Sequence, residues 1–351
     1  MNDDGRRMQA VQKIRPAFGL ELRDVPEPSS PLPDEVILSV AATGVCGTDL
    51  HIYEWTPGYE AMTARMPVTL GHEFSGVVAR VGPDVRGLEV GTLVAVRPSV
   101  VCGVCAACSR GHADDCEKRT GIGITRDGAL ASVVRVPAEN CVAVPHGLDP
   151  CIAALAEPMT VSAESIATGE VRAGSRVLIL GPGNIGQGAA LFAREAGAAK
   201  IVVAGRHDAP RLRVLQKLGF TDLVDVGDTP LHSALAPHLA GGRFDVVIEA
   251  TGAPAIVQPA LDVLRRRGIL VVVGIHAKPA TIDLTRLVRA QQQIRGSYRA
   301  PRATWPAVIA FLGRNASLVD AMITHRLPLH RAIEGIELSR TRAASKVVIV
   351  P

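Results

Sequence analysis

The sequence predicts an α/β protein of two domains, one irregular and mostly β, the other built on a doubly wound parallel sheet. Three observations lead to this prediction. The chain has 351 residues, more than one hydrophobic core usually serves. Glycine and proline interrupt the stretch from Pro26 to Pro150 often, whereas from Glu157 onward apolar runs alternate with helix-like stretches. This change of pattern marks the expected domain boundary.

The first region contains short apolar runs separated by turn residues. Residues 36–40, 77–81 and 93–96 are such runs, and each is followed closely by glycine or proline. Short strands divided by frequent turn signals are typical of a mostly β domain.

The second region reads as strands alternating with helices. Its apolar runs are residues 177–180, 201–204, 246–248 and 269–273. Residues 184–196 and 210–218 have helical spacing, and Gly197 and Gly219 follow them as expected helix stops. Continuous apolar strands joined by helices predict a parallel sheet with both faces covered. The alternation ends after Tyr298.

Composition argues against two classes of partner. With 47% hydrophobic residues, 21% charged residues and no apolar run near twenty residues, no membrane span is expected. The net charge of +4 comes from scattered lysines and arginines, and aromatic residues make up only 3%, so no nucleic-acid partner is expected. The first fifteen residues lack an apolar stretch and do not resemble a secretory signal, which predicts a cytoplasmic protein.

Four cysteines form a cluster with metal-binding spacing. Cys102, Cys105, Cys108 and Cys116 follow the pattern C-x2-C-x2-C-x7-C. Four thiolates can close a tetrahedral shell around one zinc ion, which is typical of a structural site. A disulfide pair or unliganded thiols are the alternatives, and a reducing compartment disfavours the first. A closed site leaves no position for a substrate, so catalysis is expected elsewhere.

A glycine-rich turn follows the apolar run RVLIL. Its G-x-G-x-x-G pattern at the start of an expected helix is typical of a turn that binds a dinucleotide pyrophosphate, against the alternative of an ordinary glycine-rich turn. The residues expected to bind the cofactor here are Gly181, Pro182, Gly183, Asn184, Ile185 and Gly186.

The residue that distinguishes NAD from NADP is expected about twenty positions past the last glycine. Gly205 and Arg206 stand there in place of an acidic residue. A guanidinium pairs with a 2′-phosphate, so Arg206, with Arg211 nearby, favours NADP(H) over NAD(H). Asp208 could restore an acidic contact if the turn is shifted, and Arg206 could also be a solvated surface residue.

Two further segments complete a family resemblance. GVCGTDLHIYEW contains Cys46, Thr48 and His51, and GHEFSGVV contains His72 and Glu73. The spacing of these residues alone does not decide whether they form a metal site. Together with the cysteine cluster and GPGNIG, however, these segments resemble the zinc-containing medium-chain alcohol dehydrogenase family. CGTDLHIYEW, PVTLGHEFSG and ITHR are most similar to its sorbitol and L-threonine 3-dehydrogenase branch.

The resemblance implies a fold. It predicts a barrel-like, GroES-like catalytic domain formed by residues 1–156 and 299–351, with a Rossmann domain formed by residues 157–298 between them. It also implies a homo-oligomer, either a dimer or a tetramer, with the tetramer favoured.

The resemblance implies two zinc ions per subunit and a reaction. Cys46 and His72 would hold the catalytic zinc, Glu73 would be a ligand or a close neighbour, and Glu157 would complete the set directly or through water. Thr48 would accept the proton of the substrate hydroxyl, and His51 would pass it on. The expected small-molecule substrate is a secondary alcohol: a polyol, sugar alcohol or hydroxy amino acid.

Several alternatives remain open. The chain could be an L-threonine 3-dehydrogenase proper, a reductase of simple aliphatic or aromatic carbonyls, or a non-catalytic binding protein on the same fold. Threonine dehydrogenases carry a histidine three residues before the first cysteine of the cluster, whereas this chain has Ser99. A polar pocket could be shaped by Arg97 just upstream, by Tyr53 and Trp55 after His51, or by Arg299, and each of these residues could instead serve packing or lie at the surface.

Overall fold

The computed structural model describes residues 5–351, which cluster into two compact units. The first unit runs as far as Glu157 and resumes at Trp305–Pro351, and the second is Pro158–Thr304. Residues 1–4, part of the segment in which no secretory signal is expected, lie outside the described residues.

The first unit is mostly β. Its strands are β1 Arg7–Lys13, β2 Glu21–Pro26, β3 Glu35–Gly44, β4 Val68–Thr69, β5 Glu73–Val81, β6 Leu93–Val96, β7 Ser99–Val100, β8 Thr120–Gly121, β9 Val133–Pro137, β10 Cys141–Ala143, β17 Ile323–Pro328 and β18 Lys346–Val350. Its helices are α1 Gly47–Glu54, α2 Ala106–Ser109, α3 Pro150–Ala153, α11 Thr304–Arg314, whose first residue belongs to the second unit, α12 Ala316–Val319 and α13 Ala332–Arg340. Short 3-10 helices cover Glu60–Arg65, Ala113–Asp115, Ala138–Asn140, Asp320–Met322 and Leu329–Arg331.

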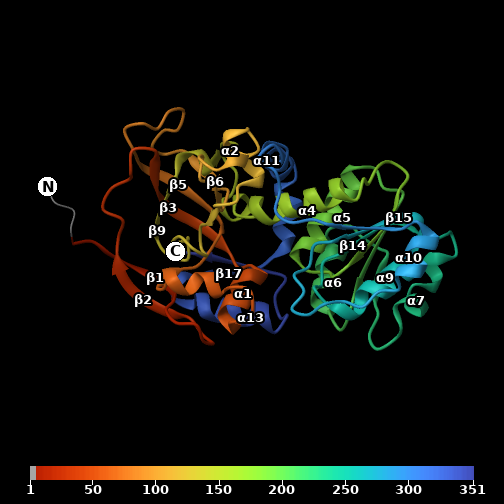
Figure 1. The fold of residues 1–351 in the computed structure, drawn as a ribbon. Helices are drawn as coiled ribbons and strands as arrows, with labels where there is room; N and C mark the ends of the chain where they lie inside the picture. The colour runs from red at the N-terminus through yellow and green to blue at the C-terminus, as the bar shows by residue number, and fades with distance from the viewer. Residues whose placement is uncertain (1–4) are drawn as a thin grey trace. The chain divides into compact units, whose positions relative to one another are not determined.

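Strand β3 is the centre of this unit. It pairs antiparallel with β5, β9 and β18, in a sheet of order β10-β6-β5-β3-β18-β17 with β9 on β3. Nearly all of β3 is buried, and Val36 and Leu38 pack with Phe74 in one hydrophobic cluster. Strand β18, near the C-terminus, pairs with β3. Segments from opposite ends of the chain therefore lie side by side, as the blue and red-orange ribbons show (Figure 1).

The second unit is a six-stranded parallel sheet of order β13-β12-β11-β14-β15-β16. Its strands are β11 Arg176–Leu180, β12 Lys200–Gly205, β13 Leu223–Asp225, β14 Phe244–Glu249, β15 Leu264–Val272 and β16 Gln293–Gly296. Its helices are α4 Ala156–Thr168, whose first two residues belong to the first unit, α5 Asn184–Glu195, α6 Ala209–Lys217, α7 Leu231–Ala234, α8 Ala236–Leu239, α9 Val257–Val263 and α10 Leu284–Ala290, with a 3-10 helix at Pro254–Ile256.

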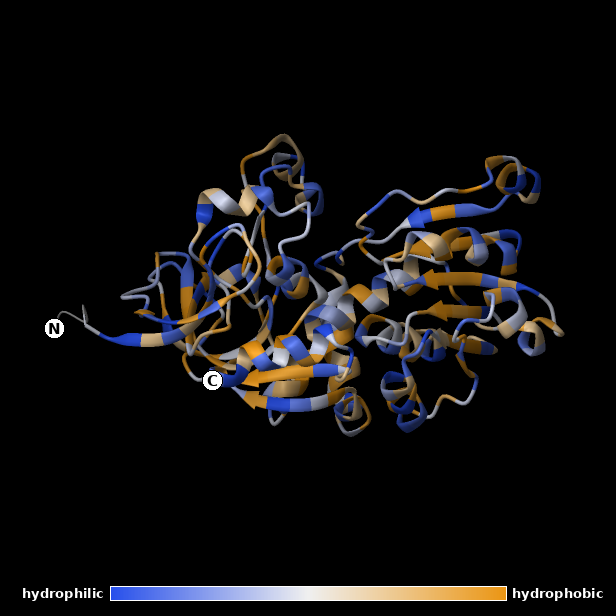
Figure 2. Ribbon diagram, turned by 90° about the horizontal axis from the view of Figure 1, so that it is seen from below, coloured by the Kyte–Doolittle hydropathy of each residue, from blue (hydrophilic) through white to orange (hydrophobic). Residues whose placement is uncertain are grey.

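The strand order reverses between β11 and β14. Helices α5 and α6 connect strands on one side of this point, and α9 and α10 connect strands on the other. Right-handed crossovers running in opposite directions place these two pairs of helices on opposite faces. Buried apolar strands flanked by mixed helices appear as orange arrows among bluer ribbons (Figure 2). The predicted doubly wound parallel sheet is confirmed.

Among residues 5–351, no helix combines the length and the hydropathy that a bilayer crossing requires.

Candidate metal and cofactor sites

Helix α1 positions three of the predicted site residues. Cys46 is its N-cap, and the Asp49 carboxylate accepts a hydrogen bond from the Cys46 backbone N–H at 2.9 Å. This reciprocal capping fixes the first turn. Thr48 and His51 are three residues apart on α1 and therefore lie on one face of the helix.

Cys46 meets His72 and Glu73 in a compact group. Their ligand atoms, one from each side chain, all lie within 4.8 Å of one another. Glu73 begins β5 and pairs in register with Gly44 at the end of β3, two residues before Cys46. His72 and Glu73 are buried. Three protein ligands of this kind suit a zinc ion that keeps a fourth position for substrate.

Two charged residues that the sequence did not single out belong to the same cluster. Asp49 is fully buried, and one of its carboxylate oxygens lies 3.8 Å from His72 Nδ1. Lys346, the first residue of β18, donates hydrogen bonds to Glu73 Oε2 and, at 2.9 Å, to the carbonyl of Val45. Lys346 thus brings a positive charge to the buried side of Glu73.

Burial and mutual charge shift the protonation of this cluster. Burial and the neighbouring Glu73 raise the pKa of the Cys46 thiol. For His72, burial opposes protonation, but the negative charges of Cys46 and Asp49 outweigh it, and the pKa rises well above its usual value. A bound dication stabilises a thiolate and a neutral imidazole and so reverses both tendencies. The donor set therefore fits a zinc ion.

Glu157 lies beside this group. It is in the first turn of α4 and is partly buried. Its charge helps to raise the pKa values of His72 and Lys346, which places it near them. It is not one of the three residues whose ligand atoms lie within 4.8 Å of one another.

His51 is held by contacts near the end of α1. Its Nδ1 lies 3.1 Å from Thr56 Oγ1, and its ring stacks on Tyr59 with centroids 6.2 Å apart. The orientation leaves Nε2 for a second partner. Thr48, one turn earlier, is partly buried.

The four clustered cysteines form a separate group of sulfur atoms. Cys105 Sγ lies 3.5 Å from Cys108 Sγ and 3.9 Å from Cys116 Sγ, and Cys116 Sγ lies 3.6 Å from Cys102 Sγ. Hydrogen bonding led by the backbone near Cys108 lowers the pKa of Cys105 to about 6, which favours a thiolate. This group has the donor set of a closed zinc site.

The glycine turn joins β11 to α5 with little room for side chains. Gly181 has φ of +107°, and a Cβ on Gly186 would lie 1.9 Å from the Gly181 carbonyl oxygen. Gly183 is the N-cap of α5, has no side chain to cap it, and faces open space. Free N–H groups at an open helix N-terminus bind phosphate. The turn therefore fits a dinucleotide.

The remaining residues of the turn support that shape. The Pro182 carbonyl accepts a hydrogen bond from Gln187 at 2.8 Å, and the Ile185 carbonyl accepts one from Ser162 at 3.0 Å. Asn184 begins α5. These bonds anchor both ends of the turn to buried parts of the unit.

The two predicted cofactor arginines differ in environment. Arg206, directly after β12, is exposed and lies 2.9 Å from the carboxylate of Asp228. Arg211 on α6 is largely buried and lies 3.3 Å from Asp208. Asp208 is only 4% exposed, so it turns away from solvent at the strand end.

Two of the possible pocket residues are engaged in packing. The Tyr53 hydroxyl donates to Glu337 at 2.7 Å, and this tyrosine is buried. Arg97 donates to the carbonyl of Glu139. These contacts favour a packing role for both side chains.

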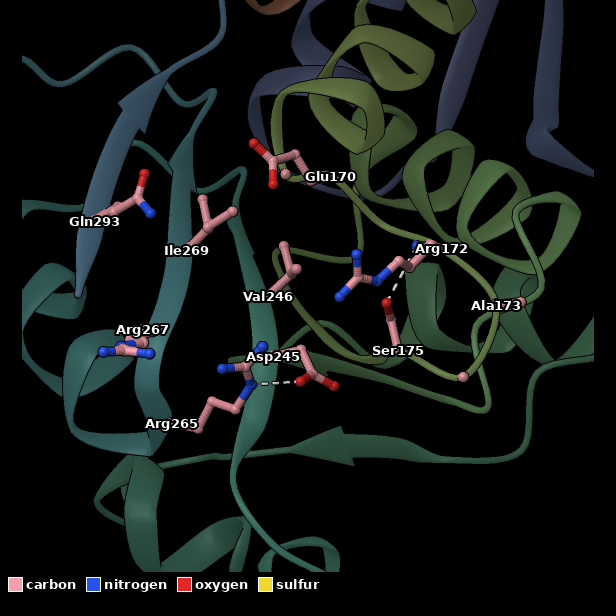
Figure 3. Close-up of a pocket in the computed structure, with 12 residues that line it drawn as sticks. Glu170, Arg172, Ala173, Ser175, Asp245, Val246, Arg265, Arg267, Ile269 and Gln293 are labelled. Atoms are coloured by element: carbon pink, nitrogen blue, oxygen red, sulfur yellow. Dashed lines mark hydrogen bonds and ion pairs between the residues drawn. The ribbon is translucent and has the colours of Figure 1, made fainter. Parts of the chain in front are cut away.

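A surface pocket lies at the amino ends of the strands of the parallel sheet. Its lining includes Ser175 before β11, Asp245 in β14, Arg265 and Arg267 in β15 and Gln293 in β16. Arg265 pairs with Asp245 at 2.5 Å (Figure 3). These residues stand at the amino ends of the strands, whereas the glycine turn follows a carboxyl end. The pocket is therefore not part of the dinucleotide site.

Known proteins match both units. The alcohol dehydrogenase GroES-like domain family matches residues 32–146, and the zinc-binding dehydrogenase family matches residues 184–314. The chain is 33% identical to L-threonine 3-dehydrogenase of Saccharopolyspora erythraea over 97% of its own length and 98% of that protein. It is 32% identical to the Bacillus subtilis L-threonine 3-dehydrogenase over 98% of its length and 99% of that protein.

Solved structures agree along the whole chain. A protein from Sinorhizobium meliloti described as a zinc-binding dehydrogenase bound to NADP superposes with a TM-score of 0.86 at 30% identity, covering 99% of this chain and all of that one. The 2R,3R-butanediol dehydrogenase of Bacillus subtilis gives 0.84 at 26% identity, covering 98% and 99%. The chain therefore belongs to the zinc-containing medium-chain alcohol dehydrogenases, in their threonine and sorbitol dehydrogenase branch, a family of oxidoreductases that use zinc and a nicotinamide dinucleotide.

Proposed function

We propose that this chain interconverts a secondary alcohol and a ketone at a zinc ion held by Cys46 and His72, with Glu73 and Glu157 as exchangeable or neighbouring ligands. The observation that carries the proposal is the buried group formed by Cys46, His72 and Glu73, with ligand atoms within 4.8 Å of one another. A zinc ion there supplies Lewis acidity to the substrate oxygen.

Residues on α1 provide a path for the proton of the substrate hydroxyl. Thr48 lies two residues after Cys46 at the start of α1 and accepts the proton of the substrate hydroxyl. His51, one turn further on, receives it and releases it, with its ring held by Thr56 and Tyr59. A positioned relay of this kind provides general-base catalysis.

A second zinc ion is proposed at Cys102, Cys105, Cys108 and Cys116. The short distances among the four sulfur atoms support it. Four protein ligands leave no position for substrate, so this ion stabilises the loop and takes no part in the reaction. Cysteines at this spacing remain unoxidised most readily in a reducing compartment, which supports a location in the cytoplasm.

NADP(H) is proposed as the preferred cofactor, bound by the turn from Gly181 to Gly186, with Arg206 and Arg211 near the adenosine ribose. Arg206 directly follows β12, the place from which a Rossmann domain contacts the ribose. The Sinorhizobium meliloti relative is described as bound to NADP. No nucleic-acid partner is proposed.

The substrate class is a polyol, sugar alcohol or hydroxy amino acid. Among the structural relatives is galactitol-1-phosphate dehydrogenase of Escherichia coli, with a TM-score of 0.87 at 25% identity, covering 98% of this chain and all of that one. The second candidate is L-threonine 3-dehydrogenase itself, which the names of the curated relatives favour and the serine at position 99 disfavours. A reductase of simple carbonyls is a third, and the intact ligand set argues against a non-catalytic binding protein.

The test is a substrate panel. The rates of NADP⁺ and NAD⁺ reduction by zinc-loaded protein are measured with polyols, L-threonine and simple secondary alcohols. Turnover of a polyol with NADP⁺ is the expected result. NAD⁺-linked oxidation of threonine would instead identify a threonine dehydrogenase, and the absence of turnover with every alcohol would contradict the proposed reaction for this panel.

We also propose a homo-oligomer, a dimer or a tetramer. β16 is an edge strand of the parallel sheet, and the apolar side chains of Ile294 on it and of Leu284 and Val288 on α10 are exposed. Exposed apolar residues beside an unpaired strand edge suit association with a second copy. Light scattering from the purified protein measures the number of subunits.

A further inference from the structure

The carboxyl ends of β12 and β13 bring an arginine and an aspartate together. The two strands are parallel neighbours, and Gly205 pairs with Asp225 where both strands end. Arg206 follows the first strand and Asp228 follows the second. Arg206 Nη2 lies 2.9 Å from Asp228 Oδ1, and Arg206 Nε donates to the Gly227 carbonyl at 3.2 Å. The guanidinium is therefore held on the turn after β13.

A second set of contacts fixes this turn. Asp225 Oδ1 accepts hydrogen bonds from the backbone N–H groups of His207 at 2.9 Å and Gly227 at 3.1 Å. His207 has φ of +49°, and its Nε2 lies 3.2 Å from Asp228 Oδ1. The hydrogen bond and charge of Arg206, with those of His207, hold the pKa of Asp228 below its usual range. Asp228 is thus a carboxylate at neutral pH.

Asp208 is not equivalent to Asp228. It is 4% exposed and lies beside Arg211, whereas 80% of the Asp228 side chain is exposed. Asp228 is therefore an exposed carboxylate twenty-two residues beyond Arg206, in the turn after β13, whereas Asp208, two residues beyond Arg206, is buried.

We propose that Asp228 determines cofactor specificity by competing with the 2′-phosphate of NADP(H) for Arg206. This inference rests on the proposed function only in placing the adenosine ribose next to Arg206. The Asp228 carboxylate repels a 2′-phosphate and accepts a hydrogen bond from the 2′-hydroxyl of NAD(H). One arginine and one aspartate at the same place thus set the balance between the two cofactors.

The solvent exposure of Arg206 and Asp228 determines how strongly Asp228 weakens the binding of NADP(H). The Arg206 and Asp228 side chains are 67% and 80% exposed, and ion pairs of this kind are weak. A 2′-phosphate can therefore displace Asp228, and NADP(H) still binds. Removing one negative charge a few ångströms from a phosphate in water is expected to tighten NADP(H) binding about three- to tenfold.

The experiment measures cofactor affinity without turnover. Dissociation constants of zinc-loaded protein for NADPH and NADH are obtained by calorimetry, for the wild type and for Asp228→Asn. We expect the variant to bind NADPH about three- to tenfold more tightly and NADH equally or less tightly. The gain should shrink as salt screens the charges. An unchanged ratio of the two constants would overturn the proposal.

A matched control separates the site from general charge. Asp262 pairs with Arg286 at 2.7 Å in the same unit, on helix α9. Asp262→Asn makes the same change in net charge away from the strand ends, and the ratio of constants should not move. An equal shift in both variants would show that net charge alone is responsible and would contradict a role for Asp228.

The outcome is independent of which cofactor the wild type prefers. If the wild type prefers NADH, the proposed NADP preference fails, yet Asp228→Asn is still expected to move the ratio toward NADPH. Competition for Arg206 requires that this shift be smaller in an Arg206→Ala background. A shift of the same size in that background would overturn the competition.

Discussion

Lys346 and Glu73 form an ion pair in which each side chain is only 2% exposed. The pair joins the first residue of β18 to the first residue of β5, which lie 273 positions apart in the sequence. A lysine ammonium on this carboxylate neutralises it and competes with a metal ion for its oxygen atoms. Whether Glu73 ligates zinc or lies beside it therefore depends on Lys346.

Removing Lys346 alone should destabilise the protein strongly. In zinc-free protein, Lys346→Met leaves the Glu73 carboxylate buried without its counter-charge, which typically costs about 3–5 kcal/mol. Urea unfolding of the variant measures the loss. Glu73→Gln with Lys346→Met removes both charges and should unfold at higher urea than Lys346→Met alone. If the unfolding free energy of Lys346→Met lies within about 1 kcal/mol of the wild-type value, the ion pair does not stabilise the protein to this extent.

Gly44 is expected to tolerate no side chain. A Cβ at this position would lie 2.5 Å from Glu73 Oε2 and 2.9 Å from Lys346 Cε. Gly44→Ala should therefore displace Glu73, lower zinc affinity and reduce the unfolding free energy by about 1–3 kcal/mol, as for other overpacked sites. Zinc content after dialysis against a weak chelator measures the first effect.

A glycine elsewhere in the same unit serves as the control for this change. A Cβ on Gly313 of α11 meets only Pro145, at an ordinary 3.4 Å. Gly313→Ala should retain zinc and stability. Equal zinc loss from both variants would contradict a specific clash at Gly44.

The cysteine cluster should hold one zinc ion that the reaction does not use. Cys116→Ser removes one of four ligands, so the metal content should fall by one zinc per chain and the loop should become sensitive to protease. Metal analysis and limited proteolysis provide the measurement. A variant that keeps its full zinc content would count against a closed four-cysteine site.

Lys13 should make stability depend on alkaline pH. It is fully buried by its neighbours, and its amine donates to the carbonyls of Gly19 and Tyr53. Burial lowers its pKa from 10.5 to about 8. Between these values the unfolded chain binds the proton and the folded chain does not, so the contribution of Lys13 to stability rises with pH. Below pH 8 the cost of burying the charge is fully present.

The variant Lys13→Met lacks this titration. Urea unfolding from pH 7.5 to pH 10 should show the wild type gaining stability relative to Lys13→Met as pH rises. Parallel pH profiles for the two proteins would show that Lys13 keeps its ordinary pKa.

Local sequence was sufficient to predict the parallel sheet. The middle of a strand that is buried on both faces must be apolar, and the runs 177–180, 201–204, 246–248 and 269–272 fill this place in β11, β12, β14 and β15. The exposed arginines at the start of β15 lie outside the run that predicted this strand. The glycine turn was recognisable because its spacing reflects a local steric need, such as the 1.9 Å approach at Gly186. Both signals lie within a few residues.

Charged residues that pair only in the folded structure leave no local pattern in the sequence from which the pairing could be predicted. Lys346 precedes the apolar run VVIV and looks like the exposed start of a strand, because its partner Glu73 is distant in sequence. Asp228 is in a polar turn, and only the pairing of β12 with β13 brings it next to Arg206. Asp49 did carry a local signal, since it stands three residues after Cys46 at the start of a helix.

A zinc ion held by Cys46 and His72 is proposed to activate the alcohol. The most direct test compares zinc content and alcohol oxidation in the same preparations of the wild type and Cys46→Ala. We expect two zinc ions per chain in the wild type and one in the variant, which should lose alcohol oxidation while its cysteine cluster still holds zinc. A variant that oxidises alcohols at the wild-type rate would contradict this proposal.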